Sequence, residues 1–289
     1  MPTTPTPMID THQHLLYPAS FHYSWAADVP ALQGDFRLEE YRVASEGCGI
    51  EGTIFMEVDA DESAGEASFF CRLAENPAHR ILGVIAAARP ENPDFEKYLD
   101  EIAHPALKGI RRVLHTQPDE LSQTVLFRKN LSLLGKRGLT FDLCVLQRQL
   151  PLALDLVRAC PETAFVLDHC GVPDIAGNAA PSGGGFEIWQ QDIRSLAEAS
   201  HVFCKISGLT AYAGENERTV AGLKPYFETV LEAFGPARCL WGGDWPVVNL
   251  GSGLAAWCQL TASLLAGLSE GERADVLVGN AQRFYLKLP

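Results

Sequence analysis

The chain has 289 residues, of which 47% are hydrophobic and 20% charged, and its formal net charge is −13. This balance is typical of a globular protein with a substantial core, and no apolar run approaches the roughly 18 residues that cross a bilayer, so a membrane partner is not expected. The acidic excess would repel a phosphate backbone, which argues against nucleic acid as a partner.

The cysteines and the N-terminal segment bear on compartment and domain organisation. The eight cysteines show no Cys-x-x-Cys spacing, and most lie in apolar segments. We therefore predict reduced core residues of a cytoplasmic protein, with disulfides or a thiolate zinc site as the lesser alternative. Residues 1–7 lack the basic and apolar regions of a signal peptide, so they predict a flexible arm ahead of a single domain at 8–289.

Short β-type runs recur along the chain, and each is followed by a helical pattern. Eight strands alternating with helices predict a parallel sheet that closes into a (β/α)8 TIM barrel, a fold of about 250 residues. The predicted strands are Met8–His12, Gly52–Val58, Ile81–Ala87, Leu107–Arg111, Leu139–Leu143, Ala164–Asp168, Val202–Ile206 and Cys239–Gly242.

Two of the predicted helices carry clear end signals. Apolar residues between Val220 and Phe234 make one stripe at helical spacing, and Gly235 follows as a stop. Ser269 and Glu272 have the spacing of a capping box that opens a late helix reaching about Val278.

The first predicted strand ends in Asp10-Thr11-His12-Gln13-His14. Side chains two apart in a strand point to the same face, so the imidazoles of His12 and His14 can converge on one metal ion or one substrate atom. The alternative is a pair of half-exposed polar residues at a strand end. Active-site side chains usually lie where rigid strands enter loops, which favours the site.

The second and fourth strands add charged groups at their ends. Glu57 lies within an apolar run, where a carboxylate is costly unless it binds a cation or a donor. It is therefore a candidate metal ligand or acid, or the partner of a nearby arginine. The fourth strand presents cations that suit an anionic or oxyanionic substrate group, followed by an imidazole: Lys108, Arg111, Arg112 and His115.

The later strands also deliver polar residues. The fifth offers Asp142 but no histidine, and the sixth ends in Asp168 and His169. A buried histidine that caps the strand is the structural alternative for His169. After the eighth strand, Asp244 follows two glycines and precedes Trp245. Apolar neighbours would raise its pKa toward the range of a general base, although a turn or N-cap role is the alternative.

Taken in order, these motifs resemble those of the amidohydrolase superfamily, and more narrowly its branch of sugar-acid lactonases and 2-pyrone-4,6-dicarboxylate lactonase. The resemblance rests on Asp-x-His-x-His, Lys-Gly-Ile-Arg, Leu-Asp-His-Cys-Gly, Lys-Ile-Ser-Gly, Trp-Gly-Gly-Asp-Trp-Pro and Asn-Ala-x-Arg-Phe-Tyr, over nearly the whole chain. It implies a barrel whose site lies at the carboxyl ends of the strands, with an Asp from the last strand that activates water.

Carried onto this sequence, the resemblance implies that His12, His14, His169 and Asp244 are catalytic. It does not carry the two-metal arrangement, because the fifth strand has no histidine. A mononuclear or metal-free site remains. The expected ligands of one Zn²⁺ or Mn²⁺ are His12, His14, Glu57, His169 and Asp244. The expected substrate contacts are Lys108, Arg111, Arg112, His115, Trp245 and Trp25, with Trp25 or Tyr23 closing over the substrate.

The expected function is hydrolysis of a small sugar-acid lactone or related cyclic ester. Within the superfamily, a zinc-dependent decarboxylase and a lactone isomerase are alternatives, and only decarboxylation releases CO₂. A non-catalytic sugar-acid binding protein is the alternative from another class, although a binder has no need of a base. The substrate itself and the oligomeric state are left open, because specificity lies in loops such as 15–34 and 174–185.

Overall fold

The computed structural model describes residues 6–177 and 185–288. The predicted arm at 1–7 falls mainly outside the described residues, as does most of the glycine-rich part of loop 174–185. Among the described residues, no helix has the length and apolar character needed to cross a membrane. All eight cysteines are free and buried, as predicted for core thiols.

Eight parallel strands form one sheet in chain order, so each strand pairs with the next one along the sequence. The predicted TIM barrel is confirmed. The strands are β1 (Met8–Gln13), β2 (Ile50–Met56), β3 (Ile81–Ala87), β4 (Leu107–Val113), β5 (Thr140–Cys144), β6 (Ala164–Leu167), β7 (Val202–Ile206) and β8 (Cys239–Trp241).

The barrel closes between β1 and the chain that follows β8. The hydroxyl of Thr11 donates to the carbonyl of Trp241 at 2.6 Å, and Gln13 forms a parallel bridge with Trp245. The backbone N–H of His14 donates to the carbonyl of Trp245 at 2.9 Å. These bonds place the ends of the first and last strands side by side, although the two lie more than 200 residues apart in the chain.

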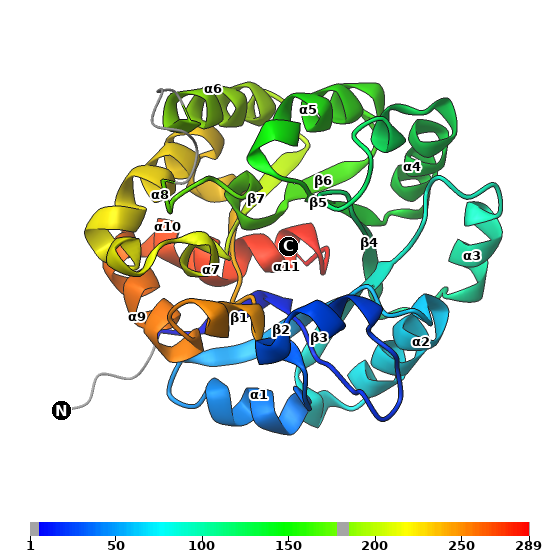
Figure 1. Cartoon of the computed structure of the whole chain (residues 1–289), viewed down its shortest axis with the longest axis horizontal. Coiled ribbons are helices and arrows are strands. Elements are labelled where there is room, and N and C mark those ends of the chain that lie inside the picture. The colour runs from blue at the N-terminus through cyan, green and yellow to red at the C-terminus, as the bar shows by residue number, and fades with distance from the viewer. Residues whose placement is uncertain (1–5, 178–184, 289) are drawn as a thin grey trace.

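Helices surround the strands, and most of the core lies between the two layers (Figure 1). The α-helices are α1 (Leu38–Ala44), α2 (Ser63–Ala74), α3 (Phe95–Glu101), α4 (Val125–Arg137), α5 (Leu150–Ala159), α6 (Gly185–Ala197), α7 (Leu209–Tyr212), α8 (Val220–Phe234), α9 (Leu254–Leu264), α10 (Glu270–Ala274) and α11 (Asn280–Phe284). Within the first long loop, 3-10 turns form at η1 (Ser24–Asp28) and η2 (Pro30–Leu32).

The late helix is longer than predicted. Ser269 and Glu272 form the expected capping box, but the chain continues past Val278 through a π-helical turn, η11 (Asp275–Gly279), into α11. The side chain of Asn280 donates to the carbonyls of Pro236 and Cys239, both at 2.7 Å, and this bonding holds the helix against the start of β8. Helix α11 lies at the centre of the ring in Figure 1, where it packs on inward-facing barrel residues.

Candidate active site

His12 and His14 come from the end of β1, and both are at most 5% exposed. Their ring centroids lie 4.8 Å apart, so the predicted convergence of the two imidazoles is present. The Nδ1 atom of His14 lies 3.0 Å from the carbonyl of Met56, which can only accept a hydrogen bond. Nδ1 therefore carries the proton in the neutral ring, and the lone pair at Nε2 is left to face the site.

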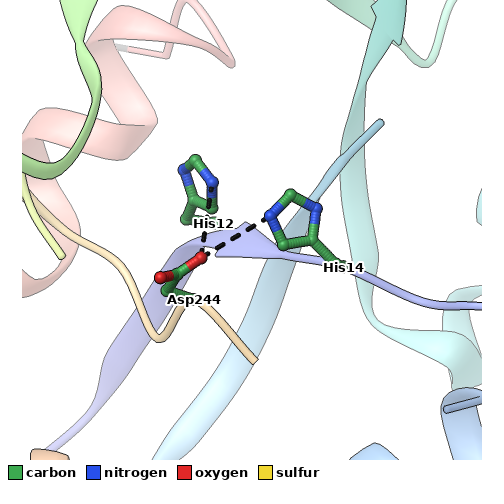
Figure 2. A group of neighbouring side chains, drawn as sticks. All are labelled: His12, His14 and Asp244. Carbon is green, nitrogen blue, oxygen red and sulfur yellow. Dashed lines mark ion pairs between the residues drawn. The ribbon is translucent and has the colours of Figure 1, made fainter. Parts of the chain in front are cut away.

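One carboxylate oxygen lies close to three histidines. The Oδ1 atom of Asp244 lies 3.8 Å from Nε2 of His12, 3.6 Å from Nε2 of His14 and 3.9 Å from Nε2 of His169. Figure 2 shows the first two of these contacts converging on Asp244, from His12 on β1 and from His14 directly after it. The four side chains predicted to be catalytic thus form one cluster.

The backbone at two of these residues is unusual. His169 has φ 53° and Asp244 has φ 57°, both in the left-handed region that non-glycine residues rarely adopt. The N–H of Asp244 donates to the carbonyl of His12 at 2.8 Å, which fixes the turn against β1. Such strain persists where the surrounding structure holds it, and it concentrates at functional sites.

The ligand atoms of His12, His14 and Asp244 all lie within 4.8 Å of one another and could hold a divalent metal ion, and His169 approaches the same Asp244 oxygen. In tetrahedral coordination with metal–ligand distances of about 2.1 Å, neighbouring ligand atoms lie about 3.4 Å apart. The observed distances from Asp244 to the histidines, 3.6 to 3.9 Å, are slightly longer than that. The buried Oδ2 of Asp244 has no hydrogen-bond partner among the described residues, so this carboxylate has accepting capacity to spare.

A buried lysine lies beneath the histidines. Lys205 comes from β7, is fully buried, and contacts Oδ2 of Asp142 at 2.5 Å and Oδ1 of Asp168 at 3.1 Å. Its Nζ also lies 3.3 Å from Nδ1 of His12. The hydroxyl of Tyr285, from the end of α11, donates to Asp142 at 2.9 Å. This network supports His12 from the side away from the pocket.

Arg111 is the cation that the fourth strand brings to the site. Its guanidinium pairs with the carboxylate of Glu57, donates to the Glu57 carbonyl at 2.6 Å, and lies 3.6 Å from Oδ2 of Asp168. One terminal nitrogen reaches within 3.4 Å of Nε2 of His12. The second Glu57 oxygen accepts from the N–H of Asp59 at 2.5 Å. Glu57 is therefore a partner of Arg111, as the alternative interpretation of the sequence held.

Burial sets the protonation states of the cluster. It lowers the pKa of His12 well below the usual value and, with Arg111, lowers that of His14 to about 4. It also lowers the pKa of His169. Burial raises the pKa of Asp244 to about 6, against the opposing effects of His169 and Arg111. At neutral pH the three imidazoles are neutral and the Asp244 carboxylate is ionised, which suits metal ligation.

The buried charges of the site are unequal. Four carboxylates, Glu57, Asp142, Asp168 and Asp244, stand against two cations, Arg111 and Lys205. Burial alone would raise the pKa of Asp168, but Lys205 and His12 hold it well below its usual range. When all four carboxylates are ionised, two negative charges are left without a cation. A divalent ion among the histidines would balance them.

A pocket of about 390 Å³ opens above the cluster. His14, His169, Arg111 and Asp244 line its floor, and Trp25 and His115, two of the predicted substrate contacts, line its wall. The indole N–H of Trp25 donates to the carbonyl of Val58 at 2.6 Å, which holds the first long loop over the end of β2.

Other sequence-predicted contacts are not brought together with this cluster. Lys108 lies at the start of β4, and its ammonium donates to the carbonyl of Pro105. Arg112 alternates to the opposite face from Arg111 and pairs with Glu91 at 2.8 Å. Trp245 is buried against Phe36 and Tyr41. These three residues line no part of the pocket, so we do not assign them to substrate binding.

Sequence reasoning named Asp142 on the fifth strand but assigned no role to Asp142 or to Lys205. Lys205 and Asp142 each stand in an apolar strand, which was the available signal, because a charge in such a run needs a buried partner. The spacing of the residues in the sequence did not indicate which charged side chains form ion pairs. Tyr212, from α7, lines the pocket near His169, with the two ring centroids 6.0 Å apart, and no motif had singled it out.

Comparison with known proteins agrees with the motifs. The sequence matches the amidohydrolase family over residues 9–287. The chain belongs to the amidohydrolase family. This amidohydrolase is therefore an enzyme, and the predicted family is confirmed. It is 28% identical over 287 residues to an L-fucono-1,5-lactonase of Burkholderia ambifaria, a match that covers 96% of this chain and 94% of the relative.

Two further relatives broaden the comparison. A 4-sulfomuconolactone hydrolase of Rhizobium radiobacter is 28% identical, and the match covers 82% of this amidohydrolase and 75% of that protein. A crystal structure of an amidohydrolase from Burkholderia multivorans with bound zinc superposes with a TM-score of 0.87 at 26% identity, covering 98% of this chain and 100% of that one. The same barrel fold therefore occurs in a related amidohydrolase whose crystal structure contains bound zinc.

Proposed function

We propose that this amidohydrolase hydrolyses a small sugar-acid lactone or a related cyclic ester. The observation that carries the proposal is the convergence of three neutral histidines on the Asp244 carboxylate at the floor of a pocket sized for a small molecule. The names of the relatives support the substrate class, because both the fuconolactonase and the sulfomuconolactone hydrolase are named for lactones.

Asp244 is the proposed general base. Its Oδ2 has no hydrogen-bond partner among the described residues and can accept a proton from a water molecule as the water oxygen attacks the lactone carbonyl carbon. The ring C–O bond then breaks, and the leaving alkoxide takes this proton back from the Asp244 carboxyl. The product is an open-chain hydroxy acid, and Asp244 returns to its ionised form.

Arg111 faces the position where negative charge develops. The guanidinium lines the pocket floor, and its orientation is fixed by Glu57 and Asp168. Donors and positive charge that are held in place stabilise an oxyanion without the cost of reorganisation. The buried pair beneath His12, Lys205 with Asp168, fixes that ring in turn.

We further propose one resident divalent ion, Zn²⁺ or Mn²⁺, held by His12, His14, His169 and Asp244. When bound, such an ion supplies Lewis-acid polarisation of the carbonyl. Glu57 is left out of the proposed ligand set, because both of its oxygens already accept hydrogen bonds, from Arg111 and from Asp59.

The test is a screen of lactones against the purified protein, with acid release followed by a pH indicator and the products analysed by mass spectrometry. Hydrolysis adds one water to the lactone and gives a hydroxy acid. Release of CO₂ from an aromatic acid, or a cyclic product of unchanged mass, would instead identify a decarboxylase or an isomerase. Ligand-dependent thermal stabilisation without turnover would identify a binding protein.

A further inference from the structure

The wall of the pocket is largely hydrocarbon. Apolar side chains reach it from the first long loop, from the ends of β2 and β4, and from the loop after β8, and they surround the polar floor on several sides. They are Leu16, Trp25, Val29, Leu32, Val58, Val113, Pro246, Val247 and Leu250. The polar wall is small by comparison and comprises Asp59, His115, Thr116 and Tyr212, beside Cys144.

Arg111 and Asp59, which line this pocket beside the ionised Asp244, are each already paired with a group of opposite charge. Arg111 pairs with Glu57 and Asp168, and Asp59 pairs with Arg89 at 2.6 Å. Among the described residues that line the pocket, Arg111 is the single arginine, and lysine is absent. A carboxylate or sulfonate on the substrate would therefore enter without a free cation to receive it, beside the acidic Asp59.

A fully hydroxylated lactone also fits this wall poorly. Each ring hydroxyl that faces leucine or valine loses its hydrogen bonds to water and gains none in return. The few polar groups of the wall can form hydrogen bonds only with ring hydroxyls that point toward them. A hydrocarbon substituent, by contrast, gains free energy for every methylene that the wall removes from water.

From these observations we propose that the preferred substrate is an uncharged lactone that carries an alkyl or aryl substituent and few hydroxyls. The lactone carbonyl meets Asp244 and the histidines at the floor, and the substituent lies against Trp25, Leu32 and Leu250. This inference rests on the proposed function, and of the two substrate classes named there it selects the related cyclic ester over the polyhydroxylated sugar-acid lactone.

The experiment measures kcat/KM for δ-lactones with no side chain and with alkyl chains of increasing length, beside glucono-δ-lactone and a carboxylated lactone. We expect kcat/KM to rise about fourfold for each methylene that the wall buries. The hydroxylated and carboxylated lactones should be the slowest. Rates that do not depend on chain length, or faster hydrolysis of either polar lactone, would overturn the inference.

Two variants test whether the dependence on chain length arises from the pocket wall at Leu250. Leu250 lines the pocket and is 39% exposed, so Leu250→Asn should be tolerated by the fold. We expect it to lower kcat/KM for the longest alkyl lactone about fivefold more than for the unsubstituted one. Leu288→Asn, at a residue that is 49% exposed and outside the pocket, should leave kcat/KM for both lactones unchanged. Equal losses on both lactones in Leu250→Asn would contradict the proposed position of the substituent.

Failure of the underlying function gives a different result. If no lactone is hydrolysed, the proposed function is wrong, and the preference of the wall is then measured as binding by calorimetric titration. Tighter binding of the alkyl lactone than of glucono-δ-lactone would support the inference. Equal binding, or tighter binding of the polar lactone, would overturn it.

Discussion

Gly208 packs directly on His169. A Cβ atom at position 208 would lie 2.7 Å from Nδ1 of His169, a contact that real side chains do not make. Gly208 follows β7 with φ 69°, in the left-handed region that favours glycine. The orientation of one site histidine therefore depends on a residue that has no side chain.

We predict that Gly208→Ala loses activity through displacement of the His169 ring. Gly138→Ala is a matched control, because Gly138 also has φ 69° and an added Cβ would meet no atom within 4 Å. Both variants should lose about 1 kcal/mol of unfolding free energy from backbone strain. Only Gly208→Ala should lower kcat, by tenfold or more, in steady-state assays. Similar kcat values for the two variants would show that His169 is not held in this way.

The Lys205 network predicts strong coupling between buried charges. Lys205→Met leaves the carboxylates of Asp142 and Asp168 without their shared cation, and we expect it to cost about 3–5 kcal/mol in urea unfolding. Adding Asp142→Asn removes one of the unpaired charges, so the double variant should be more stable than Lys205→Met alone. Additive losses in the double-mutant cycle would rule out the coupling.

Glu66 predicts a dependence of stability on pH. This carboxyl on α2 is 1% exposed, forms no ion pair among the described residues, and has a pKa raised well above 4.5, chiefly by burial. Because the folded state holds this proton more tightly than the unfolded state, its contribution to stability is lost as the pH rises above about 4.5.

We expect Glu66→Gln to gain stability relative to the unmodified protein as the pH rises from 5 to 8, as measured by urea unfolding. Glu39→Gln serves as the control, because Glu39 is exposed. A stability difference between Glu66→Gln and the unmodified protein that stays constant over this pH range would contradict the assignment.

Removal of metal gives a further prediction. Dialysis against a chelator should abolish lactone hydrolysis and lower the melting temperature, and one equivalent of Zn²⁺ or Mn²⁺ should restore both. His14→Asn should weaken metal retention in elemental analysis, whereas His79→Asn should not, because His79 lies on the 3-10 turn before β3. Full activity at a metal content near zero would show that the histidines act as hydrogen-bonding groups.

Much of the fold followed from the sequence, because a (β/α)8 barrel repeats one local pattern and several of the apolar strands end at or next to a polar residue. The strand ends were less certain. The strand predicted to end at Val58 stops at Met56, where Glu57 turns to pair with Arg111. Helix α11 was missed because the late helix was predicted to end at about Val278, whereas Asn280 bonds to the barrel and the chain stays helical.

The candidate site, like the fold, could be predicted only in part from the sequence. His12, His14, His169 and Asp244 could be found because their strands end together at one rim of the barrel. The sequence could not show which charged side chains pair with each other, because pairing depends on the face of the strand from which each side chain projects. Arg111 and Arg112 are adjacent in sequence, yet one faces the pocket and the other faces Glu91. The apolar pocket wall comes largely from loops, and the geometry of those loops is not encoded in a periodic pattern.

The most direct test of the central claim compares Asp244→Asn with the unmodified protein, both loaded with metal, in hydrolysis of the best lactone from the screen. Asp155→Asn, at an exposed position on α5, is the control. Because general base catalysis contributes about 10²–10⁴-fold, we predict that kcat for Asp244→Asn falls at least a hundredfold while the melting transition stays cooperative. A kcat for Asp244→Asn within tenfold of the unmodified value would contradict the claim that Asp244 activates water.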